Sequence, residues 1–407
     1  MSGTFRSLAI HNYRTWAAGA IVSNIGTWMQ RTAQDWLVLA ELTNHNATAV
    51  GIVTGLQFGP QLLLLPVTGH VADHFDRRRL LFITQASMGV LALGLGLLTV
   101  LGVAQLWHVY VFAFLLGCAA AFDAPARQSF VSELVHEAHL SNAVALNSAS
   151  FNAARMVGPA LAGVLIAGMG VGWVFILNAI SFAAVLMSLS RLRLDELHPR
   201  THAPQGARNL IAGFQYVLKR PDLLLVLFVL FVVGTFAINF PIFISTMAVS
   251  VFRVGASQFG LLTSMMAIGS VAGALLAARR EHPSLNIIIA GAGAMGFGLA
   301  LAAIAPTYIL FGLALVIVGL AAQTLTATSL GKVQLSTDAF MRGRVMAILM
   351  AVTLGGTPIG APIMGWIADA FGPRWAVAAG AGSCFIAAGA AVLFLSRRSA
   401  ATAAQPR

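Results

Sequence analysis

Three charged side chains lie inside long apolar runs of this sequence. The chain has 407 residues but only 24 Lys and Arg and 13 Asp and Glu. Arg31 and Asp35 are four residues apart, so on a helix they share one face and can satisfy one another. Arg155 lies about halfway along another apolar run. A carboxyl group in such a place can exchange a proton, and the two arginines can hold a polar or anionic part of a substrate.

A purely structural role for these three residues is the alternative. A charge inside a bilayer adds roughly 2.5 to 3.5 kcal/mol to the cost of insertion and faces the interior of a helical bundle by default. Arg31, Asp35 and Arg155 can therefore also form a buried pair or triad that never meets a ligand. The sequence leaves both interpretations open.

Neutral polar residues in the apolar runs are further candidates for lining a cavity. They are Asn24, Gln30, Gln57, Gln61, Asn147, Asn152, Asn239 and Gln323. Each of them can instead be a hydrogen-bond partner between helices, an interaction that contributes about 0.6 kcal/mol.

The composition indicates which solvent surrounds these runs. Apolar residues make up 58% of the chain and charged residues 9%, whereas a soluble domain carries roughly 25% charged residues. The net charge of +11 comes from short basic clusters, such as residues 77–79, which fill every second gap between apolar runs. That alternation is the positive-inside pattern of a membrane protein. It argues against nucleic acid as a partner and predicts that both termini are cytoplasmic.

The apolar runs are each near the roughly 20 residues that span a bilayer. The first six fall at about 14–41, 48–72, 79–102, 106–131, 140–168 and 172–190, and the second six at about 222–248, 257–278, 285–304, 308–331, 344–369 and 374–396. We therefore predict an all-α polytopic membrane protein with twelve transmembrane helices in two six-helix bundles. Residues 1–190 and 221–398 would form the bundles, 191–220 a cytoplasmic linker and 399–407 a cytoplasmic tail.

The two halves repeat in sequence at a constant offset of 202 residues. The matched pairs include Gly117 with Gly319, Gly158 with Gly360, Gly163 with Gly365, Gly170 with Gly372 and Trp173 with Trp375. Parallel repeats related by an axis along the membrane normal are one way in which transporters build a cavity between two bundles. The repeat therefore favours a transporter.

A basic loop after the second run has a recognisable pattern. Residues 69–78 read Gly-His-Val-Ala-Asp-His-Phe-Asp-Arg-Arg, which resembles the Gly-x-x-x-Asp-x-x-Gly-Arg-Arg loop of the major facilitator superfamily, with Asp76 in place of the second Gly. The resemblance implies a conformational latch. Its residues would be Gly69, Asp73, Arg77 and Arg78, completed by Asp123 and Arg127 at the end of the fourth run. A topology anchor and a snorkelling surface pair are the alternatives. We expect Glu133, Glu137, Asp195 and Asp338 to be solvated loop charges.

A second resemblance lies in the fifth run. Residues 158–163 read Gly-Pro-Ala-Leu-Ala-Gly and are similar to the Gly-Pro motif of antiporters in the same superfamily. A Gly-Pro step removes a backbone hydrogen bond and lets a helix bend, while ordinary packing of small residues is an equal alternative. The candidate bend residues are Gly158, Pro159 and Gly163, with Gly360, Pro362 and Gly365 in the second half.

Two further runs narrow the resemblance within the superfamily. Residues 24–30 and 123–134 look like the branch that contains enterobactin-type siderophore exporters and macrolide efflux proteins. The resemblance implies secondary active, proton-coupled efflux of a small amphipathic organic compound by alternating access, hence drug efflux and antibiotic resistance or siderophore export. A proton-symport importer of the same fold and a non-transporting receptor or scaffold are the alternatives.

No nucleotide-dependent drive is expected, because the chain lacks the Gly-x-x-x-x-Gly-Lys-Ser/Thr loop that cradles phosphate. We expect no enzymatic activity, no cofactor and no metal. The expected partners are a small-molecule substrate, protons and the lipid bilayer of a bacterial cytoplasmic membrane, in which the chain would act as a monomer.

Overall fold

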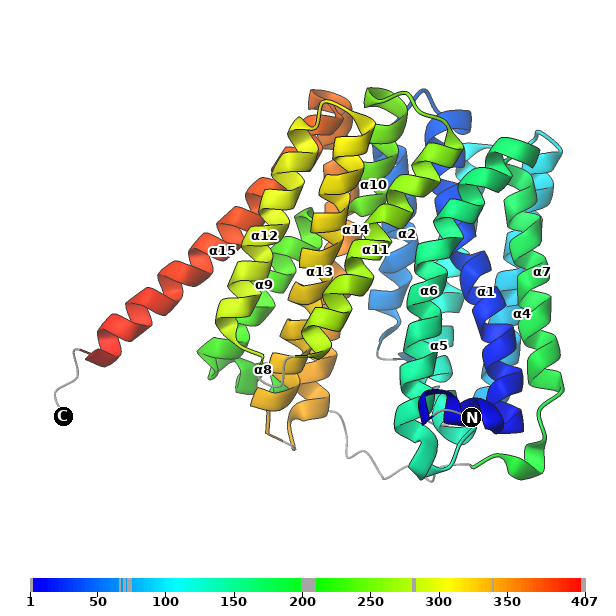
Figure 1. Ribbon diagram of the computed structural model, residues 1–407, viewed down its shortest axis with the longest axis horizontal. Helices are drawn as coiled ribbons and strands as arrows, with labels where there is room; N and C mark the ends of the chain where they lie inside the picture. Colours follow the sequence, from blue (N-terminus) through cyan, green and yellow to red (C-terminus); the bar gives the residue numbers. More distant parts are fainter. Residues whose placement is uncertain are drawn as a thin grey trace. The chain divides into compact units, whose positions relative to one another are not determined.

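The computed structural model describes residues 3–65, 67–68, 71, 75–198, 210–279, 283–338 and 340–403, and in these residues every regular element is a helix. Figure 1 traces the helices in chain order. The chain divides into two compact units. One comprises residues 1–205 and 253–264, and the other residues 206–252 and 265–407.

The first unit is built mainly of six long helices with short helical turns between them. In order these are η1 (Gly3–Ala9), α1 (His11–Trp36), η2 (Leu37–Leu42), α2 (Ala47–Leu63), α4 (Arg77–Val100), α5 (Leu106–Phe130), η3 (Val131–Glu133), α6 (Glu137–Met169), α7 (Val171–Ser190) and η4 (Leu194–Glu196). Near one end of the unit the rings of Tyr13, Trp16 and Phe130 are fully buried, and Trp16 meets Phe130 edge to face at 5.4 Å. This aromatic core fixes α1 against the end of α5.

The rest of the chain adds nine elements. They are α8 (Leu210–Leu218), α9 (Pro221–Phe236), α10 (Phe240–Thr246), η5 (Met247–Val251), α11 (Ala256–Ala278), α12 (Leu285–Ile304), α13 (Tyr308–Ser336), α14 (Arg342–Phe371) and α15 (Pro373–Ala403). The first residues of α11 cluster with the first unit and the remainder with the second. One expected helix is interrupted, because residues 237–239 break the run between α9 and α10.

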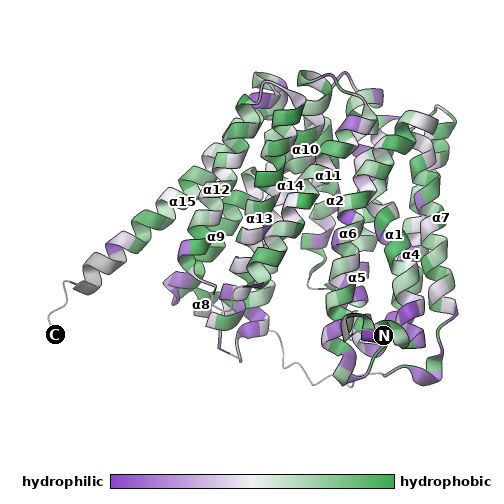
Figure 2. Cartoon of the chain, viewed as in Figure 1, coloured by the Kyte–Doolittle hydropathy of each residue, from purple (hydrophilic) through white to green (hydrophobic). Residues whose placement is uncertain are grey.

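Ten helical stretches of the described residues are long and apolar enough to cross a membrane. Figure 2 shows hydrophobic residues along most of each helix and hydrophilic residues gathered towards the helix ends. Large apolar side chains such as Ile83, Ile180 and Trp375 are more than 60% exposed, as expected where lipid is the solvent. The chain is thus an all-helical, multi-pass membrane protein. The predicted spans at 14–41 and 48–72 are not among the ten, so the count of twelve stays a prediction.

The internal repeat is visible in the backbone as well as in the sequence. Gly170 separates α6 from α7 at φ +88°, and its partner Gly372 separates α14 from α15 at φ +101°. Glycine adopts this conformation without the steric cost that a Cβ atom brings. In both halves, too, a π-helical turn (η2 or η5) ends the first run and a non-glycine residue with positive φ follows, His45 or Arg253.

Candidate functional site

Arg31 and Asp35 lie in the last two turns of α1, which is followed directly by the π-helical turn η2. A π-helical turn is rare and often marks a functional position. The Arg31 guanidinium carbon lies 4.9 Å from the ring centre of Trp28 and 5.7 Å from that of Phe58. Arg31 and Asp35 are close enough to interact electrostatically. Nevertheless, no ion pair within 4.0 Å joins them in the described part of the chain.

Arg155 lies on α6, which packs against α1. Its Nε atom is buried and has no hydrogen-bond partner among the described residues. No ion pair within 4.0 Å joins Arg155 to Asp35 among these residues. Trp28 packs edge to face on Phe151, one turn before Arg155, with ring centres 5.8 Å apart. Trp28 thus contacts both the Arg31 guanidinium and the ring of Phe151, one turn before Arg155.

A glutamine pair adds a second unpartnered donor. The Gln57 Nε2 donates to the Gln34 Oε1 at 3.0 Å, while the Gln34 Nε2 is buried without a partner among the described residues. Gln61 donates to the Gln57 backbone carbonyl at 3.1 Å. Gln34 was not among the residues selected from the sequence, although it lies one position from Asp35. A buried donor without an acceptor is costly unless water or a ligand satisfies it.

The remaining cavity candidates fall into different environments. Gln30 accepts a hydrogen bond from Asn178 on α7, which in turn accepts one from Ser181 at 2.8 Å. Asn152 donates to its own helix at Ser148. These contacts fit the interhelical or local hydrogen-bonding alternative. The structure gives the side chains of Asn147 and Gln323 no hydrogen bond among the described residues.

Asn239 lies at the break between α9 and α10 and is fully buried. Its Nδ2 donates to the Thr235 carbonyl at 2.7 Å, and its Oδ1 has no partner in the described part of the chain. The break exposes backbone groups that a continuous helix would satisfy.

The predicted latch residues Asp123, which is buried, and Arg127, which is partly buried, belong to a polar network that joins three helices. The Asp123 carboxylate accepts hydrogen bonds from Thr84 at 2.9 Å, from Gln85 and from the Arg127 Nε at 3.1 Å. Arg127 also donates to the Asn24 Oδ1 at 3.0 Å. Asn24 thus joins the network. The Asp123 side chain is only 8% exposed. This burial argues against the alternative that Asp123 and Arg127 are a snorkelling pair on the surface.

Replacing Asp123 with Asn is expected to destabilise the protein by about 3 kcal/mol, because Arg127 would keep a buried charge without its counter-ion. A fall in the midpoint of thermal unfolding in detergent measures this. Glu196→Gln is the matched control. It breaks an ion pair with Arg193 whose side chains are 57% and 42% exposed, and exposed pairs contribute little. Equal falls in the unfolding midpoint for the two variants would contradict the conclusion that Asp123 is a buried counter-ion of Arg127.

A second ion pair joins Arg77 at the start of α4 to Glu133 at the end of η3. The expectation that Glu133 is a solvated loop charge was therefore wrong, since its side chain is 15% exposed and paired. Arg78 donates from Nε to the Leu189 carbonyl at 2.9 Å and so ties α4 to the end of α7. Gly69 and Asp73, the other predicted latch residues, lie outside the described residues.

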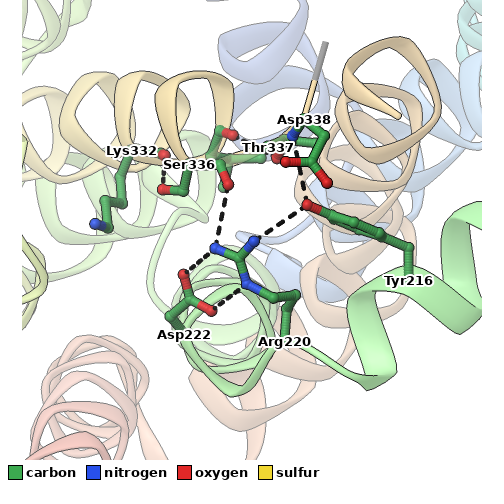
Figure 3. A network of polar contacts seen from close by, with 8 residues as sticks. Tyr216, Arg220, Asp222, Lys332, Ser336, Thr337 and Asp338 are labelled. Carbon is green, nitrogen blue, oxygen red and sulfur yellow. Dashed lines mark hydrogen bonds and ion pairs between the residues drawn. The ribbon is translucent and has the colours of Figure 1, made fainter. Parts of the chain in front are cut away.

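The second unit has its own polar cluster, drawn in Figure 3. Arg220 donates two hydrogen bonds to the Asp222 carboxylate at 2.9 and 3.1 Å, and others to the Tyr216 hydroxyl and the Ser336 carbonyl, both at 3.1 Å. The Asp338 backbone N–H donates to the Tyr216 hydroxyl at 3.4 Å. Hydrogen bonding to Asp222 raises the pKa of Arg220, so its charge is permanent. The cluster fastens α8 and the start of α9 to the end of α13.

The predicted bend residues pack closely against neighbouring backbones. A Cβ atom on Gly158 would lie 2.6 Å from the Trp28 Cβ, and one on Gly163 would lie 2.5 Å from the Ala256 carbonyl. The equivalent Gly360 faces the Thr235 carbonyl. Pro159 and Pro362 lie within continuous helices. The geometry is that of small-residue packing, while bending during function stays a prediction.

Comparison with known proteins decides the family. Residues 2–407 match the family described as transmembrane secretion effector, which belongs to the major facilitator superfamily. The chain belongs to this family. The match covers almost every residue, so it applies to both halves. The family match thus agrees with the resemblance of residues 69–78 and 123–134 to the major facilitator superfamily.

Two curated relatives of this transmembrane secretion effector match most of its length. It is 26% identical over 353 residues to the staphyloferrin A transporter of Staphylococcus aureus, covering 86% of this chain and 87% of the relative. It is 25% identical over 332 residues to an enterobactin exporter of Shigella flexneri, covering 81% and 78%. These relatives are transporters and not enzymes.

Solved structures show the same fold. A bacterial homologue of the human lysosomal transporter Spinster, in an inward-facing and occupied conformation, superposes with a TM-score of 0.74 at 16% identity, over 98% of each chain. The nucleoside transporter NupG gives a TM-score of 0.72 at 14% identity, over 95% of this chain and 99% of the other. At such low identity these likenesses establish the fold alone.

Proposed function

We propose that this chain exports a siderophore-like compound, a small amphipathic molecule with anionic oxygen groups, in exchange for protons. The observation that carries this proposal is the set of unpartnered donors in the first unit. Arg155 and Gln34 each hold a buried nitrogen without an acceptor, and Arg31 has no ion-pair partner within 4.0 Å in the described residues. Such a lining suits a substrate rich in hydrogen-bond acceptors.

Aromatic side chains between these donors favour a substrate that also has a flat apolar part. Trp28 lies next to Arg31 and Phe151 next to Trp28, and rings of this kind stack on aromatic groups at favourable energies of about 0.5 to 1.5 kcal/mol. Catechol and carboxylate groups of siderophores combine both properties. The names of the enterobactin and staphyloferrin A relatives support the same class.

Asp35 is the proposed proton carrier. It is one helical turn from Arg31, so binding of an anionic group at Arg31 would change the electrostatic field at the carboxyl group. The proton occupancy of Asp35 and the binding of substrate at Arg31 would then be coupled. An antiporter working by alternating access requires in addition that proton and substrate are carried in alternate steps.

We further propose that the protein resides in a bacterial cytoplasmic membrane with both termini in the cytoplasm. The basic clusters at residues 77–79, 191–193, 219–220 and 342–344 support this orientation. Export then moves the substrate from the cytoplasmic side, where these clusters lie, to the opposite side of the membrane.

Everted membrane vesicles that contain the protein test the proposal. No inwardly directed gradient of the substrate is needed, because respiration acidifies the lumen of everted vesicles and so supplies the proton gradient. We expect accumulation of a catecholate or citrate-based siderophore that collapses when a protonophore is added. A macrolide serves as the comparison substrate for drug efflux. Accumulation by whole cells rather than everted vesicles would favour an importer, and absence of any substrate-dependent proton flux in liposomes would favour a receptor or scaffold.

A further inference from the structure

A surface hollow of about 380 Å³ lies at the N-terminal end of α4. None of the residues of the proposed substrate and proton site lines it. Among the described residues, two arginines and two apolar residues line it: Arg78, Arg79, Phe82 and Ile83. Positive charge and apolar surface are thus combined in one depression at the end of a membrane-spanning helix.

The helical spacing separates the two kinds of residue by depth. Phe82 follows Arg78 by four residues and Ile83 follows Arg79 by four, so each pair shares one face and is one turn apart. Long side chains on a helix point back towards its N-terminus. The guanidinium groups therefore extend towards the N-terminal end of α4, while Phe82 and Ile83 lie one turn further into the helix. In a bilayer that α4 spans, the first position corresponds to the headgroups and the second to the acyl chains.

The described residues leave most donors of the two arginines without a partner. Among these residues Arg78 donates only its Nε–H, to the Leu189 carbonyl at 2.9 Å. The Arg79 side chain makes no hydrogen bond or ion pair with a described residue, and it is exposed. Asp76, the acid nearest to the two arginines in sequence, accepts a hydrogen bond from the Arg79 backbone N–H at 2.7 Å and so caps α4. No carboxylate of the described residues lines the hollow.

The apolar residues of the hollow are also uncovered by protein. Phe82 is 42% and Ile83 63% exposed. In a membrane-spanning helix such surface meets acyl chains, and a basic pocket beside it is the arrangement that binds anionic headgroups.

We propose that this hollow binds an anionic phospholipid, with its phosphodiester on Arg78 and Arg79 and an acyl chain along Phe82 and Ile83. A free phosphate ion would use the arginines but leave the apolar residues without a partner. The occupant is therefore a lipid, and both parts of it contribute to binding.

Native mass spectrometry of the detergent-purified protein tests this proposal with phosphatidylglycerol and phosphatidylcholine of identical acyl chains. We expect phosphatidylglycerol to be retained preferentially. In Arg79→Gln its affinity should fall about fivefold, since one basic residue at the headgroup level is lost. Arg342→Gln is the matched control, because it removes an exposed arginine at the start of another long helix, and it should leave the affinity unchanged.

The soluble headgroup glycerophosphoglycerol separates the lipid from its phosphate. It should bind far more weakly than the whole lipid and should not displace it at equal concentration. Equal retention of the two lipids by the wild-type protein, or equal losses in the two variants, would overturn the proposal. Tight binding of the headgroup alone would overturn the assignment to a lipid.

Discussion

Proton-driven accumulation should fall at least tenfold when Asp35 is replaced by Asn, while substrate binding persists. The amide of Asn has nearly the volume of the carboxyl group, but it does not take up and release a proton at physiological pH. Arg31 would keep its position over Trp28, which lies 4.9 Å away, so the anion-binding part of the site should remain. Uptake into everted vesicles under a pH gradient measures the loss.

Exchange at equilibrium distinguishes coupling from general damage. Preloaded Asp35→Asn proteoliposomes should still exchange labelled for unlabelled substrate, because exchange needs no net proton movement. Asp195→Asn is the control, since Asp195 lies in the exposed turn η4 and should transport like the wild type. Full pH-driven accumulation by Asp35→Asn would remove Asp35 from the mechanism and leave it a structural residue. Loss of exchange together with a fall in thermal stability would indicate the same structural role.

The helical architecture and the family could be predicted from the sequence because both depend on properties spread over many residues. Spans of about 20 apolar residues reveal themselves by composition alone, and the repeat at an offset of 202 placed Gly170 and Gly372 at equivalent positions before the structure showed both with positive φ. Such regularities survive the loss of any single residue. Individual contacts have no such redundancy.

The partners within the polar interior were largely missed for that reason. Thr84 and Gln85 were not selected, although both bind Asp123. The position of Glu133 between two apolar runs predicts a solvated charge, yet η3 turns its side chain back towards Arg77. A charge at a loop position and a charge folded back onto a helix end look the same in sequence. Only the intervening turn distinguishes them.

The backbone interruptions were missed for a different reason. Hydropathy makes residues 222–248 one continuous span, and Pro241 alone does not require a break, since membrane helices tolerate proline. The structure ends α9 at Phe236 and begins α10 at Phe240, with Asn239 buried between them. Likewise, a π-helical turn after Asp35 leaves no sign in composition. These irregular places adjoin several of the residues to which we assign function.

Among the described glycines of the second unit, Gly360 is the one at which replacement by Ala should destabilise the fold most. A Cβ atom there would overlap the Thr235 carbonyl oxygen and lie 2.5 Å from the carbonyl carbon. Both atoms are backbone, so no side chain can rotate away, and α14 must separate from α9. Overpacking of this kind costs about 3 kcal/mol at the upper end of its usual range. We expect a marked fall in the thermal unfolding midpoint and in transport.

Two other glycines of the same unit provide controls, because the added methyl group meets nothing within 4 Å of its position at Gly343, on the same helix, or at Gly382, on α15. Their Ala variants should be as stable as the wild type or slightly more so, since Ala restricts the unfolded chain more than Gly does. The contrast isolates contact from helix propensity, which all three substitutions change in the same direction. If Gly360→Ala matched Gly382→Ala in stability, α14 could not lie as close to Thr235 as the structure places it.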